Sequence, residues 1–416
     1  MGRRARRRAL SEHTYDQRAL EVEEALGVRS HRRLSVRTIV PLPSPPQKTR
    51  ALTFAILGLS LRSSWGNGHA TTYRALAKGL SERGHRVVFY ERNVPWYDAH
   101  VDGARTSAEL RLYDRPEELV QRWGDEISTA DVVVMGSYVP DGAALIDHFN
   151  GCVEGVFAFY DIDTPVTLRA IGRGQCPYLR SDQVPWFDLY LSFSGGDVLD
   201  TLETRYGAKR PRALYCAVDP DHCRPVDVED TWDLSYMGTF SADRQPGLHE
   251  LLIVPATQLA DRAFMVAGPQ YPEMLRWPRN VSRVEHVAPP SHAAFYCASR
   301  FTLNLTRQAM RDFGFSPSVR LFEAAACGVP LISDTWRGLD VIFEPGKEIF
   351  LARNARDVIE LLHDLPDADR LCVGAAARAK VLASHTAAAR AAELLGYVSE
   401  CQPSRMRGQA RRRARG

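Results

Sequence analysis

Short runs of apolar residues alternate with longer amphipathic stretches along most of this sequence. In the first half, the apolar runs cover residues 51–61, 86–91, 130–136, 155–160 and 189–193. Runs this short and this continuously apolar are typical of parallel strands buried on both faces. The stretch at residues 70–83, which ends at Gly84, predicts a helix. Strands that alternate with helices in this way predict a doubly wound α/β domain.

A second series of the same kind follows a segment that contains Pro220 and Pro225. Its patterns predict strands at 234–238, 263–268, 282–287, 301–305 and 329–333, and helices at 247–259, 292–298, 320–327 and 355–364. We therefore expect an α/β fold of two doubly wound, Rossmann-like domains that face each other across a cleft. Ligands of such sheets bind outside the carboxyl ends of the strands, so the loops at those ends are expected to carry the chemistry.

The predicted domains cover residues 51–225 and 226–385, and an amphipathic helix is predicted within residues 386–402. The flanking segments, residues 1–50 and 403–416, are rich in arginine, and the first of them ends in a proline-rich stretch. We expect both segments to be disordered. A start codon assigned too far upstream would also explain residues 1–50.

The net charge of +3 hides an uneven distribution along the chain. Residues 1–50 hold twelve Lys and Arg against five Asp and Glu, and residues 403–416 hold six Arg and no acid. The rest of the chain is therefore acidic, and we do not expect it to bind a specific nucleic acid. The basic tails allow weak contact with an anionic surface, although disordered decoration is the simpler interpretation.

Cysteine usage and hydropathy indicate the compartment. The chain has eight cysteines, none of them in a Cys-x-x-Cys pair, so a structural zinc site is not expected and the thiols fit a reducing environment. The apolar runs are far too short to cross a bilayer, and the basic start is not followed by an apolar signal core. These features predict a cytoplasmic protein.

The most informative stretch runs from Ser318 to Asp334 and predicts a helix followed by a strand. The N–H groups and the dipole at a helix N-terminus favour phosphate, and Ser318 and Arg320 lie near that end. Glu323, one turn further on, can accept hydrogen bonds from ribose hydroxyls. The pattern therefore outlines a nucleotide-diphosphate site. The plain alternative is an alanine-rich packing helix that Gly328 ends.

A glycine-containing loop, Trp65-Gly66-Asn67-Gly68, follows the first predicted strand and leads to His69. Its two glycines let the backbone approach a ligand closely, and His69 is a candidate general base or a packing histidine. A Rossmann dehydrogenase would show a similar pattern, with Glu91 as its ribose-binding acid. The dinucleotide fingerprint, however, needs a third glycine where Thr71 stands, and the glycines lie well beyond the strand end.

Two carboxylates, Asp161 and Asp163, follow the strand predicted at residues 155–160. Period-two alternation would point both to the same side, where one raises the pKa of the other and the pair can deprotonate an acceptor hydroxyl. Asp-x-Asp is also a metal-binding motif, but it is frequent by chance and we do not expect a metal here. The plain alternative is a turn, which Asp, Thr and Pro favour.

Another polar loop follows the strand that ends at Gly238, and it contains Arg244. Departure of a nucleotide diphosphate needs its developing negative charge stabilised, which Arg and helix N–H groups supply without a metal ion. Arg244 is the candidate for this role, and a solvated loop arginine is the alternative. Gly268 lies in a Gly-Pro turn at the end of the next predicted strand. His286, Asn304, Thr306 and Arg307 are lesser candidates at further strand ends.

Together, the loop at residues 65–69, the stretch at 160–165, the loop at 238–247 and the segment 318–334 resemble group 1 glycosyltransferases of the GT-B fold. They are most similar to the branch related to the spore-maturation protein CgeB, over roughly residues 53–352. The resemblance implies transfer of a sugar from a nucleotide-diphosphate sugar to a hydroxyl acceptor, with no metal ion and no cofactor.

The resemblance also implies roles for the candidate residues. The donor would be bound by Gly238, Arg244, Gly268, Ser318, Arg320 and Glu323. Asp161, Asp163 and His69 would serve catalysis, the loop from Trp65 to Gly68 would face the acceptor, and the last helix would cross back to the first domain. Well-known retaining members carry a glutamate where Phe315 stands, so the stereochemistry stays open.

Three alternatives remain open at this stage. A nucleotide-sugar epimerase would use the same donor site without an acceptor. A catalytically inactive sugar-nucleotide-binding or spore-coat-type protein would keep the fold and lose the activity. A dehydrogenase comes last. The sequence does not identify the sugar, the nucleotide, the acceptor or the oligomeric state.

Overall fold

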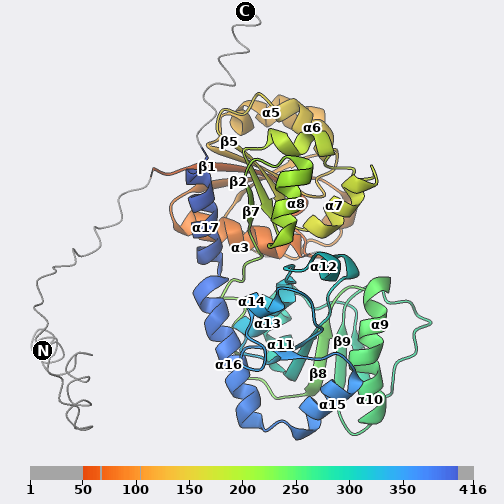
Figure 1. Ribbon diagram of the computed structural model, residues 1–416. Coiled ribbons are helices and arrows are strands. Elements are labelled where there is room, and N and C mark those ends of the chain that lie inside the picture. The colour runs from red at the N-terminus through yellow and green to blue at the C-terminus, as the bar shows by residue number, and fades with distance from the viewer. Residues whose placement is uncertain (1–49, 66–67, 104, 402–416) are drawn as a thin grey trace, which may run out of the picture. The chain divides into compact units, whose positions relative to one another are not determined.

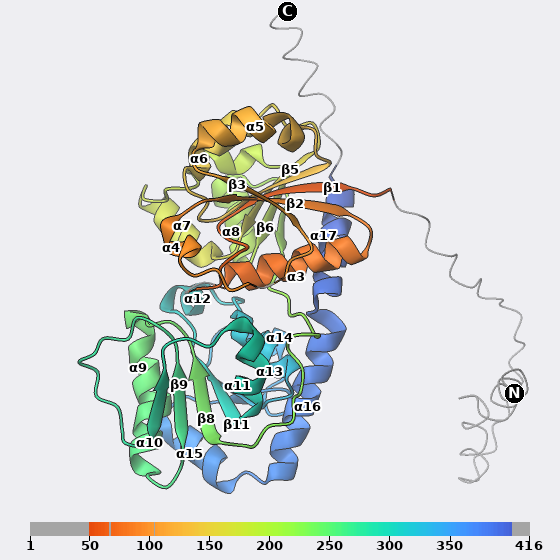
Figure 2. The same cartoon turned by 180° about the vertical axis from the view of Figure 1, so that it is seen from behind.

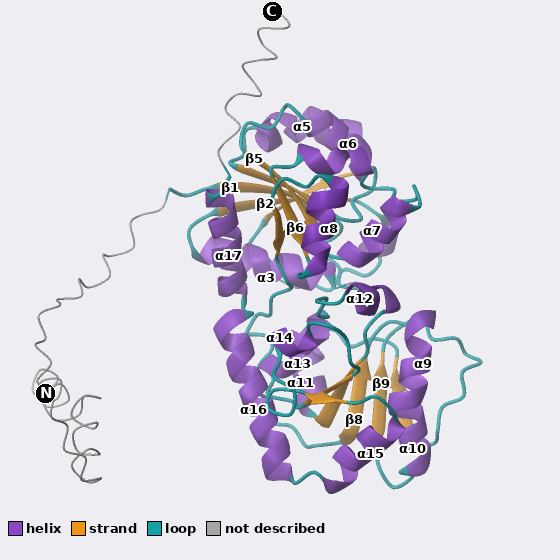
Figure 3. Ribbon diagram, viewed as in Figure 1, coloured by secondary structure: helices purple, strands orange, loops and turns teal. Residues whose placement is uncertain are grey.

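The computed structural model describes residues 50–65, 68–103 and 105–401. From Ala51 onward the described residues belong to one compact unit. The extension predicted at residues 1–50 lies outside them except for Arg50, and so does the tail predicted at 403–416. Figure 3 shows two sheets in this unit, each flanked by helices.

The first sheet has seven parallel strands in the order β3-β2-β1-β4-β5-β6-β7. They are β1 (Thr53–Gly58), β2 (Arg86–Arg92), β3 (Glu109–Tyr113), β4 (Val132–Gly136), β5 (Val156–Asp161), β6 (Leu189–Ser192) and β7 (Pro211–Ala213). The strand order reverses between β1 and β4, and this reversal is where a doubly wound sheet opens a ligand crevice. The loops that follow β1 and β4 therefore border the site.

Helices cover both faces of this sheet. They are α3 (His69–Glu82), α4 (Pro95–Asp98), α5 (Pro116–Ser128), α6 (Gly142–Phe149), α7 (Thr164–Gly172) and α8 (Asp197–Tyr206), with a 3₁₀ turn η1 (Ser181–Trp186). Alternate residues of β1 face opposite layers: Phe54 and Ile56 pack with Leu76 of α3, while Leu57 packs with Leu119 of α5. This double burial explains why the strands have nearly continuous apolar sequences.

The second sheet has six parallel strands in the order β10-β9-β8-β11-β12-β13. They are β8 (Trp232–Met237), β9 (Phe264–Ala267), β10 (Val281–Val284), β11 (Ser299–Asn304), β12 (Leu331–Ser333) and β13 (Phe350–Leu351). Its order reverses between β8 and β11, so the crevice of this sheet is bordered by the loops after those two strands. The expected fold class, two doubly wound α/β sheets, is confirmed.

The helices of the second sheet are α9 (Gln245–Leu248), α10 (Val254–Gln258), α11 (His292–Cys297), α12 (Gln308–Phe313), α13 (Val319–Ala326), α14 (Leu339–Ile342), α15 (Ala355–Asp364) and α16 (Asp367–Ser384). Short 3₁₀ turns are η2 (Ala242–Arg244) and η4 (Pro289–Ser291). The single helix predicted at residues 247–259 contains a π-helical turn, η3 (His249–Ile253), between α9 and α10. Pro255, which lacks an N–H, follows that turn and explains the break in the α-helical ladder.

The last helix, α17 (Ala387–Ser399), packs against α3 of the first sheet, as Figures 1 and 2 show. The two helices meet at Gly79, where a Cβ atom would lie 2.2 Å from the carbonyl oxygen of Ala387. The preceding helix, α16, packs against α13 of the second sheet. The chain therefore crosses between the sheets twice, and a backbone bridge between Val218 and Thr386 joins the two crossings.

Candidate functional site

A cavity of about 620 Å³ lies between the carboxyl ends of the two sheets. Its lining from the first sheet includes Gly68, His69, Tyr138 and Asp163, and from the second sheet Gly238, Arg244, Gly268, His286, His292, Tyr296, Arg307, Ser318, Arg320 and Glu323. The strand-order reversals of both sheets border this cavity. The structure thus brings most of the candidates from the sequence to one place, together with several that the sequence did not single out.

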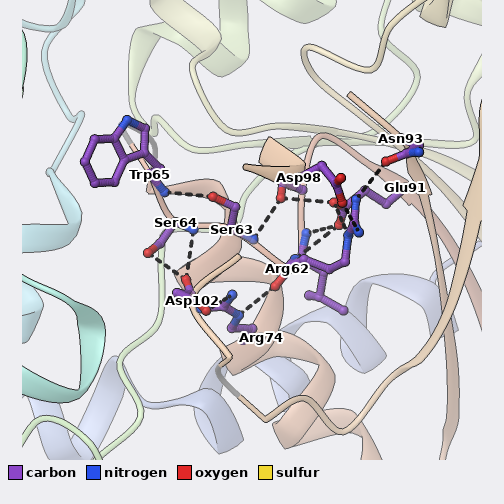
Figure 4. A network of polar contacts seen from close by, with 11 residues as sticks. Arg62, Ser63, Ser64, Trp65, Arg74, Glu91, Asn93, Asp98 and Asp102 are labelled. Carbon is purple, nitrogen blue, oxygen red and sulfur yellow. Dashed lines mark hydrogen bonds and ion pairs between the residues drawn. The ribbon is translucent and has the colours of Figure 1, made fainter. Parts of the chain in front are cut away.

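The loop after β1 is held in shape by a buried carboxylate, that of Glu91 at the end of β2 (Figure 4). It accepts hydrogen bonds from the backbone N–H groups of Leu61 (2.5 Å) and Arg62 (3.2 Å), and from the Ser60 hydroxyl (3.3 Å). The Arg62 Nε group adds an ion pair at 3.1 Å. Because these partners occupy Glu91, it shapes the loop, and the ribose-binding role that a dehydrogenase requires is not supported.

The second part of the same loop rests on Asp102, which accepts hydrogen bonds from the backbone N–H (3.0 Å) and hydroxyl (2.9 Å) of Ser64 and pairs with Arg74 at 2.8 Å. In Figure 4 the Trp65 ring points away from this network. It stacks on His100, with ring centroids 4.2 Å apart, and lies 4.5 Å from the ring of His286, which follows β10.

The remaining acceptor-side candidates are only partly described. Gly66 and Asn67 lie outside the described residues. Gly68 lines the cavity and faces the start of α13, because a Cβ atom there would lie 3.3 Å from a methyl group of Val319. Trp65 bridges between the sheets beside the cavity and is not part of its lining.

His69, the first residue of α3, faces Asp163 across the cavity wall, with Nε2 3.9 Å from the carboxylate oxygen Oδ2. The ring of Tyr138 meets the imidazole edge-on at 5.4 Å. Burial disfavours ionisation of Asp163, but His69, Arg307 and Tyr138 outweigh it and lower its pKa. The first sheet therefore presents an imidazole and an ionised carboxylate to the cavity.

Asp161 does not share this position, and the expectation that both carboxylates face the same side is wrong. Its side chain is fully buried and accepts hydrogen bonds from the hydroxyls of Thr167 (2.7 Å) and Tyr190 (2.8 Å). Burial raises the pKa of Asp161 to about 7. The alternation fails because β5 ends at Asp161 and the chain turns before α7 begins at Thr164. Asp161 lies outside the cavity lining, as a structural residue beneath it.

Glu323 of α13 lies at the opposite wall with two partners from α11. His292 Nδ1 is 3.5 Å from its Oε1, and the Tyr296 hydroxyl donates a hydrogen bond to its Oε2 at 3.1 Å. Burial disfavours the carboxylate, yet His292 and Tyr296 outweigh it and lower the pKa of Glu323. Neither partner was among the candidates that the sequence patterns indicated. Their spacing of four residues, which puts them on one helix face, is the signal that could have revealed them.

Arg320 is fixed by groups from the neighbouring strands. Its Nε donates to the carbonyl of Met237 at 2.5 Å, and a terminal nitrogen donates to Asn304 Oδ1 at 3.0 Å. Its guanidinium also stacks 4.8 Å from the centre of the Tyr236 ring. The Ser318 hydroxyl donates to the same Asn304 oxygen at 2.7 Å. Asn304 therefore positions both residues at the start of α13.

The two candidate glycines, Gly238 and Gly268, form one close backbone contact. Gly268 has φ of +147°, and a Cβ atom there would lie 2.1 Å from the carbonyl oxygen of Gly238. The Gly238 N–H donates to the carbonyl of Ala267 at 2.8 Å. This contact draws the ends of β8 and β9 together under the cavity, and no other residue type fits at Gly268.

Three arginines of the second sheet surround the cavity: Arg244, Arg307 and Arg320. Burial and the positive charges of Arg320 and Arg307 lower the pKa of Arg244, whose guanidinium donates a hydrogen bond to the carbonyl of Thr239 at 2.5 Å. Within the described part of the chain, no ion pair joins any of the three to a carboxylate, and Arg244 Nε has no hydrogen-bond partner. Like charges gathered in this way suit a multiply charged anion.

Phe315 lies outside the cavity lining, in a strained conformation with φ of +49°. Its ring fills the space beside Gly196 and Gly338, where added Cβ atoms would lie 2.3 Å from it. Its carbonyl accepts a hydrogen bond from the N–H of Gly195 at 3.0 Å. The residue therefore packs the second-sheet segment against the first sheet.

The described residues contain no group of three or more His, Cys, Asp or Glu side chains suited to hold a metal ion. Among the same residues, no helix combines the length and the apolar character that crossing a bilayer demands.

Residues 244–396 match the family model described as Glycosyl transferase-like. This stretch contains Arg244, Arg307 and the whole of α13. No curated protein sequence gives a significant match.

Solved structures resemble the chain over most of its length. Sucrose-phosphate synthase from Thermosynechococcus elongatus has a TM-score of 0.62 at 14% identity, and the match covers 84% of this chain and 98% of that one. The HepE protein of Anabaena, solved with UDP and glucose, has a TM-score of 0.61 at 12% identity, with coverage of 84% and 100%. The chain has the GT-B fold. An α-glucosyltransferase with UDP-glucose and DNA containing an abasic site resembles it equally well, with a TM-score of 0.63, 13% identity and coverage of 84% and 100%.

The fold and the family match together support a glycosyltransferase. At identities of 12–14%, the likeness to these three structures establishes the fold and nothing further.

Proposed function

We propose that this GT-B protein transfers a sugar from a nucleotide-diphosphate sugar to a hydroxyl group of an acceptor. The observation that carries the proposal is the cluster of three arginines, none in an ion pair with a carboxylate among the described residues, which faces the His69–Asp163 pair across one cavity. The match of residues 244–396 to a glycosyltransferase-like family and the fold shared with structures that hold UDP or UDP-glucose support it.

In this proposal the donor binds the second sheet. Arg244, Arg307 and the N-terminus of α13 bind the diphosphate and stabilise its charge as it leaves. Glu323 accepts hydrogen bonds from the ribose hydroxyls. Because His292 and Tyr296 use only part of its acceptor capacity, lone pairs remain for the ribose.

The acceptor binds against the first sheet, near Gly68 and Tyr138. His69 takes the proton of the acceptor hydroxyl as the new glycosidic bond forms and the bond between the sugar and the phosphate breaks. Asp163, 3.9 Å from the imidazole, then stabilises the imidazolium. Closure of the site excludes water that would otherwise hydrolyse the donor.

We further propose that the reaction needs no divalent cation, because arginines and helix N–H groups supply the positive charge that a metal ion would otherwise provide. Protein treated with a chelator should keep its full transfer rate. A rate that falls on chelation and returns with magnesium or manganese would contradict this part of the proposal.

Calorimetry with nucleoside diphosphates and their sugar conjugates tests the donor site. The wild-type chain should bind at least one of them, and Arg244→Gln and Arg307→Gln should each weaken that binding about tenfold or more, as expected for a charge-assisted hydrogen bond. Arg311→Gln is the matched control. Arg307 directly precedes α12, and Arg311 is an exposed residue within that helix. Equal affinity in all four proteins would overturn the assignment.

Turnover assays then identify the reaction. Transfer to a hydroxyl acceptor is the expected result, and the anomeric configuration of the product distinguishes retention from inversion. Interconversion of the donor in the absence of any acceptor would identify an epimerase instead. Binding without any turnover would indicate an inactive sugar-nucleotide-binding protein.

A further inference from the structure

Three thiols gather at the end of α13 that is remote from the cavity. Cys327 follows the last residue of α13, and its thiol interacts with the thiols of Cys223 and Cys297. The sulfur of Cys297 also lies 3.8 Å from the carbonyl oxygen of Cys327 and accepts a hydrogen bond from the N–H of Val226 at 3.5 Å. None of the three lines the cavity, so the proposed function leaves them without a role.

Two of the thiols lie at the ends of helices that carry donor-site residues. Cys327 ends the helix that carries Glu323, and Cys297 is the last residue of α11, which carries His292 and Tyr296. The two helices are in contact, at one end through the pair of His292 and Glu323 and at the other through the two thiols. A covalent bond at the sulfur end would therefore act on the groups that hold the Glu323 carboxylate.

The thiols differ in reactivity. Cys297 is partly exposed, whereas Cys223 and Cys327 are buried. The hydrogen bond from Cys327 lowers the pKa of Cys297, which favours its thiolate. Its hydrogen bonds to the other two sulfurs raise the pKa of Cys327, which stays a thiol. Cys297 is thus the nucleophile, and Cys327 is the neighbour able to react with it afterwards.

We propose that Cys297 and Cys327 form a reversible disulfide on exposure to a hydroperoxide, and that this bond weakens the donor site at the other end of α13. The thiolate of Cys297 attacks the peroxide oxygen and becomes a sulfenic acid, with release of water or an alcohol. The Cys327 thiol then attacks that sulfur, the sulfenic oxygen leaves as water with the thiol proton, and the disulfide forms. The peroxide takes up the two electrons, and a dithiol returns them.

The effect on the donor site follows from geometry. A disulfide holds its sulfurs about 2.05 Å apart, well inside non-bonded contact, so the ends of α11 and α13 must shift toward each other. Glu323 lies one turn from Cys327, and Tyr296 directly precedes Cys297. The hydrogen bond between Tyr296 and Glu323, which is 3.1 Å long when the thiols are free, is therefore disturbed. We expect donor affinity to fall about tenfold, as for a lost hydrogen bond to a charged group.

The experiment uses the full chain, treated with hydrogen peroxide and digested without reduction. Mass spectrometry should find the peptide pair joined through Cys297 and Cys327. Calorimetry with the tightest-binding nucleoside diphosphate should give the tenfold loss, and dithiothreitol should reverse both. Cys297→Ser should abolish the bond and the sensitivity. Cys372→Ser, which removes an exposed thiol on α16, should retain both.

Two results would overturn the proposal: a disulfide between Cys223 and Cys327 in place of the expected one, or a mapped bond between Cys297 and Cys327 that leaves affinity unchanged. The proposal that the bond matters to donor binding rests on the proposed function, but the peptide map does not. If reduced protein binds no nucleotide, the proposed function fails, and the disulfide map still tests the thiol pair.

Discussion

The Nδ1 atom of His292 lies 3.5 Å from the Oε1 atom of Glu323, and this contact joins α11 to α13 at the cavity wall. Burial works against a charge on either group, yet each partner favours the ionised form of the other. The pKa of His292 is consequently raised and that of Glu323 lowered. The pair should therefore stabilise the protein over the pH range in which both groups are charged.

Replacing His292 by Gln should make thermal stability less sensitive to pH. A histidine whose pKa is raised on folding stabilises the protein fully below its unfolded pKa of about 6.5, and this contribution is lost as the pH rises through the folded value. The difference in Tm between wild type and His292→Gln should thus be largest in mildly acidic solution and shrink as the pH increases. Calorimetry from pH 5.5 to 8.5 measures it.

His363→Gln provides the matched control, since His363 is exposed and pairs with the adjacent Asp364. Its Tm should follow the wild type closely at every pH. A His292→Gln variant whose deficit stays constant across the range would show that the histidine is not charged in the folded protein.

Removing the imidazole at position 69 should affect chemistry and spare donor binding. His69→Asn should lower the transfer rate about 10²–10⁴-fold, the usual contribution of a general base, while the Kd for the nucleotide sugar stays the same. Asp163→Asn should lower kcat in the same sense, because an uncharged amide no longer stabilises the imidazolium. Equal loss of donor affinity and turnover in His69→Asn would point to a structural role for the histidine.

The buried carboxyl of Asp161 should make stability fall as the pH rises. Its pKa is about 7 in the folded protein and 3.8 without burial, so folding takes up a proton between these values. This contribution to stability is lost as the pH rises toward 7 and beyond. Asp161→Asn removes the titration, so its Tm relative to wild type should be higher at pH 8 than at pH 5.5.

Asp367→Asn is the control for this measurement, since the hydrogen bond from Arg370 lowers the pKa of the exposed Asp367 and it stays ionised over that range. Its Tm difference from wild type should not change between pH 5.5 and pH 8. If Asp161→Asn also gave a constant difference, the carboxyl of Asp161 would have to be ionised throughout.

Alanine at position 268 should disrupt the donor side far more than its backbone strain alone explains. A Cβ atom there would lie 2.1 Å from the carbonyl oxygen of Gly238, so β8 and β9 must separate at their ends. Gly346, whose φ is +77°, has nothing within 4 Å of an added Cβ atom, so Gly346→Ala should cost only about 1–2 kcal/mol. Urea unfolding should show a clearly larger loss for Gly268→Ala, and equal losses would refute the steric argument.

The sequence predicted the two doubly wound sheets because most of their strands are buried on both faces and read as continuous apolar runs. The strand β3 escaped prediction, since its sequence from Glu109 to Tyr113 alternates polar and apolar residues at a sheet edge. Helix α16 was also missed. Residues 367–384 are rich in alanine, so the contrast between the apolar and polar faces of this helix is weak.

Within the site, sequence patterns found residues that lie directly at strand ends, such as Arg244 and Glu323. They did not separate Asp161 from Asp163, because the end of β5 decides which carboxylate is buried. They also missed His292 and Tyr296, whose importance comes from contact with Glu323 on another helix. Contacts between elements distant in the chain depend on tertiary packing, so a local sequence pattern does not predict them.

The packing of α17 against α3 has a consequence for synthesis on the ribosome. Gly79 emerges early, but Ala387, the residue that covers it, is translated more than three hundred residues later. Until then the surface of α3 around Ala75 and Gly79 lacks the native cover that α17 provides. The nascent polypeptide must keep that surface from aggregating while the other sheet is made. A chain truncated before residue 387 should therefore depend on chaperones for its solubility.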